Sequence, residues 1–268
     1  MKRSGNKGLS RYLCLWAAIS ILAVSGLIVT IQPNHAFETK EGKVNLASKT
    51  KIQSPGIPSI DEAVPSIIET ATFGLGWFWG VESQFGIIEG VIRTRVGYAG
   101  GRMNAPSYKK MGDHTETIQV DYDPSRISYN QLLDIFWQSH QPERRSWSRQ
   151  YMHAVFYHDE GQRLQAEASR VALAEKIGDK VATKVIPLRS FTMAEDYHQK
   201  YLLKGHGELK GELVRIYPSH QDLVDSTAAA RLNGYAGGHG NKAQLSREIA
   251  RLGLSTKGRE TLIELVQK

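Results

Sequence analysis

The sequence predicts a mixed α/β fold of two layers, in which helices cover a mixed β-sheet. Segments with the two-residue alternation of strands take turns along the chain with segments whose apolar residues have helical spacing. Several connections between predicted strands are short, whereas a doubly wound parallel sheet needs a long crossover between neighbouring strands. A two-layer α/β sandwich therefore fits the sequence better than a doubly wound fold.

Each predicted element has a local signal. The strands alternate apolar and polar residues and end at glycine or at an Asp-Pro pair. Strands are expected at 69–75, 91–101, 115–123, 153–158 and 182–188, and helices at 78–88, from 128, at 159–176 and at 194–203.

Capping residues mark two of these helix starts. Ser128 and Gln131 form a capping box, in which each side chain can satisfy a free amide at the start of the helix. Asp159 is placed to cap the helix that runs to about Lys176. The first of these helices buries Leu132, Leu133, Phe136 and Trp137 on one face.

The N-terminal segment has the pattern of a membrane-directed sequence. Residues 12–31 are 20 residues without a charge, about the length that crosses the hydrocarbon core. The basic residues before them favour a cytoplasmic N-terminus and send the rest of the chain outward. We expect either an uncleaved signal-anchor or a signal peptide cut near Ala36, which makes the main domain membrane-anchored and extracytoplasmic, or secreted or periplasmic.

Composition divides the rest of the chain into three parts. Residues 37–67 are rich in Lys, Ser, Pro and Gly and are expected to be a flexible tether between residues 1–36 and the domain. The domain is expected at 68–210, followed by a helical C-terminal extension at 211–268. That extension is expected to hold helices at 225–231, 242–252 and 257–266, with a turn at 234–240.

The charge balance argues against a nucleic-acid partner. Four of the seven net positive charges lie in residues 1–36, which leaves +3 for the remaining residues. That excess is too small for the basic surface that nucleic-acid binding requires.

Cysteine content limits the chemistry. Cys14, inside the apolar segment, is the one cysteine of the chain, so no disulfide can form within it. Residues 37–268 hold no thiol as the sequence is written.

Ordered motifs carry a family resemblance. They are GWFWGVE at 76–82, GYAGG at 97–101, Pro106-Ser107-Tyr108, GDHTET at 112–117, the block 122–140, Arg149-Gln150-Tyr151 and AEDYHQKYL at 194–202. In this order and spacing, residues 68–203 resemble the A-type peptide methionine sulfoxide reductases. The segment DSTAAARLNGYAGGHG is similar to an extension found on some members of that family.

The resemblance implies a fold and a site. It implies a nucleophilic cysteine at a helix N-terminus, where the helix dipole lowers the pKa of a thiol, but that position is Trp77. It also implies an acid that protonates the sulfoxide oxygen, tyrosines that bind this oxygen and aromatic residues that receive the substrate methyl group. These match Glu116, then Tyr108 and Tyr151, then Phe78 and Trp79. No metal or cofactor is implied, and a thioredoxin-type reductant is expected as a partner only if a thiol is present.

Three departures from the family pattern affect this site. Trp77 cannot attack sulfur, and a nearby hydroxyl cannot form a sulfenic acid and be recycled. Ser146 stands where the family has an acidic residue, and Met152 replaces an arginine. We expect the indole of Trp77 at the pocket mouth, either blocking substrate or adding a third aromatic wall beside Phe78 and Trp79.

The sequence therefore predicts a family member that recognises methionine sulfoxide, free or in proteins, with impaired or lost reductase activity. One alternative is an active reductase, if residue 77 is in fact cysteine or selenocysteine, whose codons differ from that of tryptophan at one base. Another is a non-catalytic scaffold or partner-binding module that acts through residues 211–268.

Overall fold

The computed structural model describes residues 56–267. The predicted apolar segment 12–31, the cleavage point near Ala36 and most of the tether at 37–67 lie outside these residues. Within the described part, no helix combines the length and the apolar character that a bilayer crossing needs.

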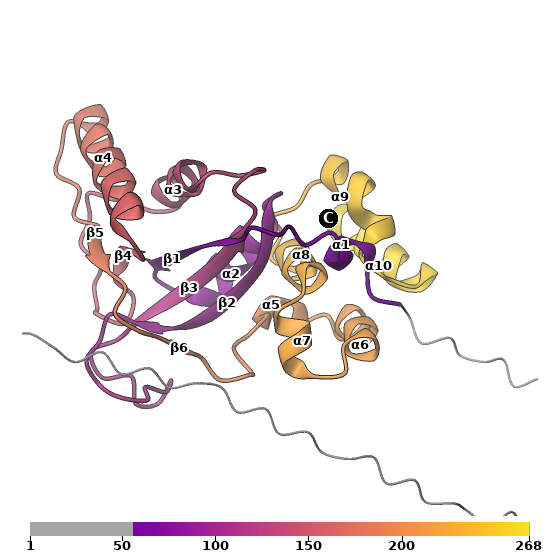
Figure 1. Cartoon of the computed structure of the whole chain (residues 1–268). Coiled ribbons are helices and arrows are strands. Elements are labelled where there is room, and N and C mark those ends of the chain that lie inside the picture. The colour runs from indigo at the N-terminus through magenta and orange to yellow at the C-terminus, as the bar shows by residue number, and fades with distance from the viewer. Residues whose placement is uncertain (1–55, 268) are drawn as a thin grey trace, which may run out of the picture. The chain divides into compact units, whose positions relative to one another are not determined.

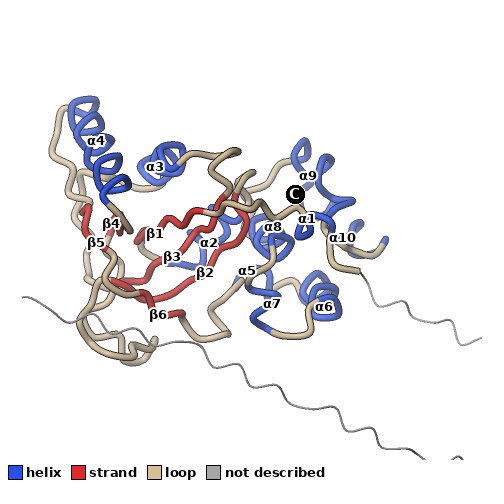
Figure 2. Tube along the Cα trace, in the orientation of Figure 1, coloured by secondary structure: helices blue, strands red, loops and turns tan. Residues whose placement is uncertain are grey.

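A six-stranded sheet with the order β5-β4-β1-β3-β2-β6 is the framework of the domain (Figures 1 and 2). Its strands are β1 (Glu69–Leu75), β2 (Val91–Ala99), β3 (Thr115–Tyr122), β4 (His153–Tyr157), β5 (Lys184–Pro187) and β6 (Phe191–Met193). The β4–β5 pair is parallel and the other pairs are antiparallel, so the predicted mixed sheet is confirmed.

Helices follow most strands and make up the C-terminal part of the chain (Figure 2). They are α1 (Ser59–Glu62), α2 (Phe78–Gly86), α3 (Tyr129–Gln138), α4 (Glu160–Ile177), α5 (Tyr201–Lys204), α6 (Gly207–Ile216), α7 (His220–Val224), α8 (Thr227–Ala236), α9 (Lys242–Glu248), the 3₁₀ helix Ile249–Arg251 and α10 (Thr256–Gln267). The capping box predicted for α3 is present, because the Gln131 amide donates to Ser128 Oγ at 3.2 Å and the Ser128 amide donates to Gln131 Oε1 at 2.8 Å.

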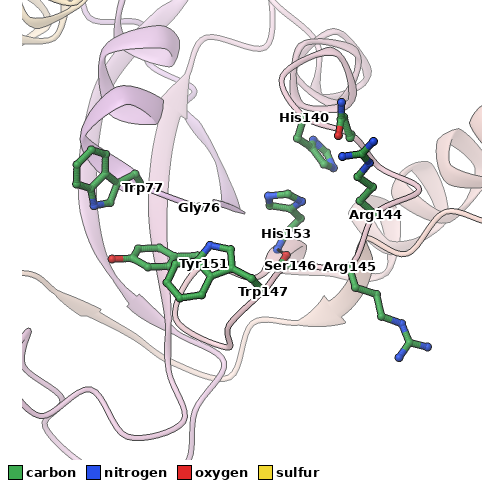
Figure 3. A pocket seen from close by; sticks show the side chains of 10 residues that line it. Gly76, Trp77, His140, Arg144, Arg145, Ser146, Trp147, Tyr151 and His153 are labelled. Atoms are coloured by element: carbon green, nitrogen blue, oxygen red, sulfur yellow. Dashed lines mark hydrogen bonds between the residues drawn. The ribbon is translucent and has the colours of Figure 1, made fainter.

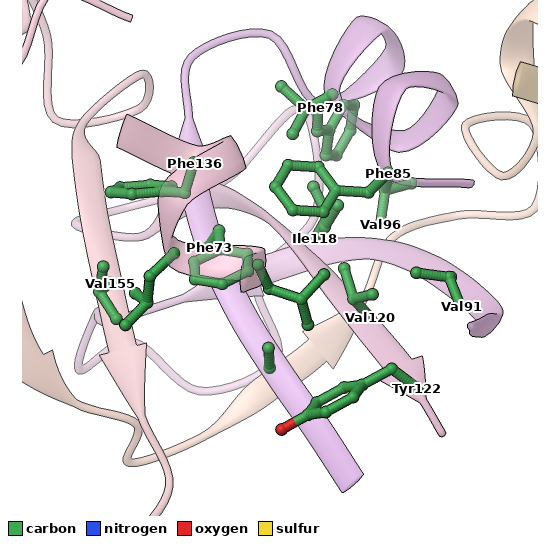
Figure 4. Packing of buried hydrophobic residues seen from close by; sticks show 14 of the residues in the cluster. Phe73, Phe78, Phe85, Val91, Val96, Ile118, Val120, Tyr122, Phe136 and Val155 are labelled. Atoms are coloured by element: carbon green, nitrogen blue, oxygen red, sulfur yellow. The ribbon is translucent and has the colours of Figure 1, made fainter. Parts of the chain in front are cut away.

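The main core lies between the sheet and two helices (Figure 4). Phe73 of β1 packs against Phe85 of α2, with ring centroids 5.3 Å apart, and against Phe136 of α3 at 5.0 Å. One strand residue thus touches both helices, which means that α2 and α3 cover the same face of the sheet. The predicted α/β layering is confirmed for the described residues.

Helix α8 packs closely on α2. A side-chain carbon added at Gly86 would lie 2.6 Å from the Ala230 carbonyl oxygen, and one added at Gly234 would lie 2.7 Å from Ile87. The predicted turn at 234–240 is therefore wrong at its start, since α8 continues through Gly234 to Ala236. Glycine serves close helix packing here. The domain boundary predicted at residue 210 stays a prediction. Helix α8 lies beyond that residue and packs on α2.

The segment 194–203 differs most from its prediction. The expected helix is confined to the short α5, which begins at Tyr201, because Lys200 has a φ of +50°. The preceding residues wrap across the end of β2, where Gln199 donates to the carbonyl oxygens of Val96 and Ala194, each at 2.9 Å. Helical apolar spacing in the sequence does not reveal these long-range contacts.

Candidate functional site

A sharp turn between β1 and α2 positions residue 77. Gly76 has a φ of +80°, a conformation that favours glycine, and Trp77 follows it as the N-cap residue of α2. The indole makes no capping hydrogen bond. Residue 77 thus stands at the positive end of the helix dipole, as the resemblance implies.

Glu116 lies beneath this turn. Its side chain in β3 is fully buried, and its carboxyl accepts hydrogen bonds from the Phe78 amide at 3.2 Å and from Gln150 Nε2 at 2.8 Å. Burial raises the pKa of Glu116, against the opposing effect of these two hydrogen bonds. Its carboxyl group therefore holds a proton to higher pH than an exposed glutamate does.

One tyrosine is linked to this carboxyl group, and a second tyrosine lies beside the first. Gln150 Nε2 also donates to the Tyr151 hydroxyl at 3.1 Å, so one amide bridges Glu116 and Tyr151. Burial first, and then the charge of Glu116 and the neighbouring Tyr108, raise the pKa of Tyr151. The phenol of Tyr151 is thus connected to Glu116 through Gln150 and stays protonated at neutral pH.

The aromatic residues of the turn form a row. Trp77 is 61% exposed and its ring centroid lies 5.3 Å from that of Trp79, which stacks on Tyr201 at 3.7 Å. Trp79 Nε1 donates to His198 Nδ1 at 3.1 Å, which holds this ring in place. Phe78 points the other way into the core and is 1% exposed. Trp77 thus lies beside Trp79 as an exposed ring, whereas Phe78 lies in the core, and the expected third aromatic wall beside both residues stays a prediction.

An open pocket of about 640 Å³ begins at Trp77. Figure 3 shows Trp77 on the side opposite His140 and Arg144, with Tyr151 and Trp147 between them. The pocket is lined by Gly76, Trp77, His140, Gln141, Arg144, Arg145, Ser146, Trp147, Tyr151 and His153. Trp77 is therefore one wall of an open pocket and does not close it.

The structure gathers all six predicted site residues around the N-terminus of α2, without enclosing them in one cavity. Trp77 and Tyr151 line the open pocket. The buried pair Phe78 and Glu116 lies under it, and Trp79 and Tyr108 lie on the far side of Trp77 around His198. Met152, one of the noted departures, is buried, and Arg149 Nη1 lies 3.6 Å from its sulfur.

Four residues that support the site were not predicted from the sequence. They are Gln150, Glu195, His198 and Tyr201, which lie within the motif blocks 149–151 and 194–202. Glu195 accepts hydrogen bonds from the Tyr98 hydroxyl at 2.7 Å and from the Tyr108 amide at 3.0 Å. The ring of His198 lies 4.5 Å from that of Tyr108, and burial lowers the pKa of this histidine. Their positions in the motifs were the available signal.

The geometry suits recognition of a polar oxygen that carries a small apolar group. The two phenols can donate hydrogen bonds, as can the carboxyl group of Glu116 when it is protonated, which its raised pKa favours. Trp79 offers an aromatic face. The helix N-terminus carries no nucleophile. Among residues 56–267, no group of three or more His, Cys, Asp or Glu side chains is placed to hold a metal ion.

Comparisons with known proteins agree with the motif order. A family model described as peptide methionine sulfoxide reductase matches residues 69–232. A peptide methionine sulfoxide reductase of Drosophila melanogaster is 44% identical over 193 residues, covering 71% of this chain and 77% of that protein. Peptide methionine sulfoxide reductase A5 of Arabidopsis thaliana is 37% identical over 201 residues, covering 72% and 74%.

Solved structures are similar as well. Mxr1 from Saccharomyces cerevisiae in reduced form has a TM-score of 0.50 and 29% identity, covering 53% of this chain and 88% of that one. Mxr1 in complex with Trx2 has a TM-score of 0.40 and 26% identity, covering 50% and 86%.

Proposed function

Because this chain belongs to the peptide methionine sulfoxide reductase family, with MsrA-type relatives, we propose that it recognises methionine sulfoxide in proteins and has lost most or all of the reductase step. The observation that carries the proposal is Trp77 at the N-cap of α2, directly above a buried Glu116. The binding groups remain in place and the nucleophile position holds an indole.

Recognition would use the groups around Glu116. The protonated carboxyl group and the hydroxyls of Tyr108 and Tyr151 donate hydrogen bonds to the sulfoxide oxygen. The indole of Trp79 receives the methyl group, whose hydrogens are polarised by the neighbouring sulfur. Trp77 adds an aromatic surface at the entrance.

Reduction would need a further group. A thiolate must form a bond to the sulfoxide sulfur, and the oxygen must pass to the thiol sulfur as a sulfenic acid, with a proton supplied to that oxygen. Indole nitrogen is a hydrogen-bond donor only. Residues 37–268 contain no thiol to take its place.

A thioredoxin-type protein is the partner in one solved relative's complex. The yeast Mxr1 structure with Trx2 shows such a complex for that protein, whereas the sequence predicts a thioredoxin-type partner here only if a thiol is present. Thiol–disulfide exchange needs a thiolate, and Cys14 in the predicted apolar segment is the one candidate. We propose that thioredoxin does not act as a reductant for the wild-type chain. A measurement of thioredoxin binding to the full chain tests whether the two proteins associate.

Three further sequence predictions each have a direct test. An active enzyme requires cysteine or selenocysteine at 77, which reading the codon decides. A scaffold role through residues 211–268 predicts binding that does not depend on Glu116. The anchored or secreted location depends on residues 12–31, which protease protection of the expressed chain would test.

The activity assay uses the full chain with Cys14→Ser, which removes its one thiol. Incubation with a methionine sulfoxide peptide and dithiothreitol is expected to release no methionine above the blank without protein. The same protein is expected to bind the peptide saturably, and Glu116→Ala and Tyr151→Phe are expected to weaken that binding. Methionine release above the blank would contradict the loss of the reductase step.

Binding is also expected to depend on pH through Glu116. Only the protonated carboxyl group donates to the sulfoxide oxygen, so affinity is expected to fall as pH rises through the raised pKa of Glu116. The loss of one donor corresponds to a decrease of about tenfold, from roughly 1–1.5 kcal/mol per hydrogen bond. Calorimetric titration between about pH 4 and pH 8 measures it.

Glu116→Gln is the matched control for this pH dependence. Its amide can donate at every pH, so the affinity of this variant is expected to stay level. The raised pKa of Tyr151 keeps its phenol neutral at these pH values, and the lowered pKa of His198 places any charge that this ring gains on the acidic side of its usual range. An equal pH dependence in Glu116→Gln would assign the titration to another group.

A further inference from the structure

A second pocket adjoins the one at Trp77. It has a volume of about 700 Å³ and lies between the loop before β4 and the loop before β5. Arg144, Arg145, Ser146 and His153 line both pockets. The two pockets are therefore neighbours with a common border at Arg144 and Arg145, and we call them together the 144–145 groove.

The charge of this groove is positive and unneutralised. The second pocket is lined by the basic residues Arg144, Arg145, Arg149, Lys180 and Lys184 and by the acidic residues Glu143 and Asp179. Within the described part of the chain, none of these basic residues has a carboxylate within ion-pair distance, whereas Arg93, Arg95, Arg163 and Arg170 each do. The groove thus keeps an excess of cationic side chains facing solvent.

Arginines 144 and 145 supply the free charge at the junction of the two pockets. Arg149 is engaged by carbonyl oxygens of Asp113 at 2.9 Å and Gly100 at 2.7 Å. Burial lowers the pKa of His140 to about 4 and also lowers the pKa of His153, so both rings are neutral at pH 7. A ligand that recognises the junction must therefore be attracted by the two guanidinium groups.

Exposed aromatic rings complete the groove at the Trp77 end. Trp147 is 83% exposed and its ring lies 5.0 Å from that of Tyr151, while Trp77 forms the opposite wall. Tryptophan, tyrosine and arginine are the residues that most often dominate the binding energy of protein interfaces. An open groove lined by several tryptophan, tyrosine and arginine residues has a composition typical of a peptide-binding surface.

We propose that the 144–145 groove binds an acidic peptide segment, with Asp or Glu side chains on Arg144 and Arg145 and the adjoining residue at the Trp77 end, next to the turn that covers Glu116. Guanidinium groups bind carboxylates through paired hydrogen bonds, which suits an acidic side chain. This inference rests on the proposed function in one respect: the adjoining residue is the methionine sulfoxide. Acidic segments that contain methionine sulfoxide are then the favoured class of substrate.

A peptide fits this groove better than a nucleic acid. Glu143 and Asp179 interrupt the cationic lining, which a phosphate backbone would have to pass. Residues 37–268 carry a net charge of only +3, and nucleic-acid-binding domains are more strongly basic. An acidic side chain needs only the short cationic stretch at the junction.

The test measures the affinity of the full chain for three labelled heptapeptides by fluorescence anisotropy. The first has methionine sulfoxide flanked by aspartates, the second has asparagines in place of the aspartates, and the third keeps the aspartates with leucine in place of methionine sulfoxide. The first is expected to bind about tenfold more tightly than the second, from two exposed charge pairs. Raising the salt concentration from about 0.05 M to about 0.5 M is expected to remove most of this difference.

Variants assign the effect to the groove. Arg144→Gln with Arg145→Gln is expected to remove the tenfold preference for the acidic peptide and to leave the neutral peptide unchanged. Arg189→Gln with Lys210→Gln removes the same charge from exposed positions outside the groove and is expected to keep the preference. Arg144→Glu with Arg145→Glu is expected to reverse the preference toward a lysine-flanked peptide, which a misfolded variant would not do.

The outcomes separate this inference from the proposed function. Equal binding of the first two peptides would overturn the acidic preference and leave sulfoxide recognition standing. Equal binding of the first and third peptides would count against sulfoxide recognition while supporting the acidic groove. Displacement of the acidic peptide by a single-stranded oligonucleotide at lower concentration than by unlabelled peptide would overturn the inference in favour of a nucleic acid.

Discussion

Trp77→Cys in the Cys14→Ser background is expected to reduce methionine sulfoxide at least about 100-fold faster than the same chain with Trp77, because removing a covalent nucleophile typically costs far more than that. The new side chain would stand at the N-cap of α2, where the helix dipole lowers the pKa of a thiol. Its backbone neighbour Phe78 is already hydrogen-bonded to Glu116, so the acid lies next to the new thiolate. Release of methionine with dithiothreitol measures the rate.

The chemistry of that variant is complete with dithiothreitol present. The thiolate of residue 77 bonds to the sulfoxide sulfur, Glu116 supplies a proton to the oxygen, and methionine leaves as the oxygen passes to the cysteine as a sulfenic acid. Dithiothreitol then reduces the sulfenic acid to the thiol, releases water and is itself oxidised to a disulfide. Because Trp77 is 61% exposed, its replacement leaves no buried cavity that would destabilise the fold.

Two controls define this result. Trp77→Ser removes the indole without adding a thiol and is expected to stay at the blank. Adding Glu116→Gln to Trp77→Cys is expected to slow turnover about 100-fold, the usual contribution of a general acid. If Trp77→Cys binds methionine sulfoxide but shows no turnover, then changes besides residue 77, with Ser146 and Met152 first, prevent the reaction.

Lys200→Met is expected to reduce the free energy of unfolding by about 3–5 kcal/mol, the usual cost of breaking a buried ion pair from one side. Lys200 and Glu82 are both fully buried, with Nζ and Oε1 2.7 Å apart. The Lys200 amide also donates to Glu82 Oε2 at 2.8 Å, and Nζ donates to the Thr94 carbonyl oxygen at 2.6 Å. Removing the ammonium group leaves a carboxylate without a counter-charge and a carbonyl oxygen without a donor.

Unfolding three further variants in guanidinium chloride shows which interaction accounts for this loss of stability. Glu82→Gln alone is expected to be destabilising, and Glu82→Gln with Lys200→Met is expected to be more stable than the Lys200→Met single variant, because no charge is left unpaired. Arg163→Met breaks the solvent-exposed pair with Glu160 and is expected to cost less than about 1 kcal/mol. A Lys200→Met cost as small as that of Arg163→Met would show that the buried pair contributes little.

The position of this ion pair also explains why it matters to the site. Glu82 belongs to α2, whose first turn carries Phe78 and Trp79, and Lys200 follows His198, which accepts a hydrogen bond from Trp79. The pair thus joins α2 to the segment that holds the aromatic row. Neither residue was predicted as part of the site, since two buried charges 118 positions apart give no local signal.

The sequence by itself determined those features whose signal lies within a few residues. The capping box of Ser128 and Gln131, the apolar face of α3 and the approximate positions of the predicted strands depend on neighbours along the chain, and the structure has them. Burial does not alternate along β1, β2 and β3, because these strands are largely buried on both faces. The ordered motifs identified the family, and the cysteine count excluded a thiol from residues 37–268. Local hydrogen bonding and side-chain periodicity suffice for such predictions.

Only the tertiary structure decided where the site residues stand. It placed Glu116 beneath Phe78, bridged it to Tyr151 through Gln150, and left Trp77 as an exposed wall of a pocket that faces Arg144. It also ended the predicted 194–203 helix in favour of side-chain contacts with β2, and it continued α8 through Gly234. These outcomes depend on contacts between residues far apart in the sequence, and they outweigh the local propensities of the segments involved.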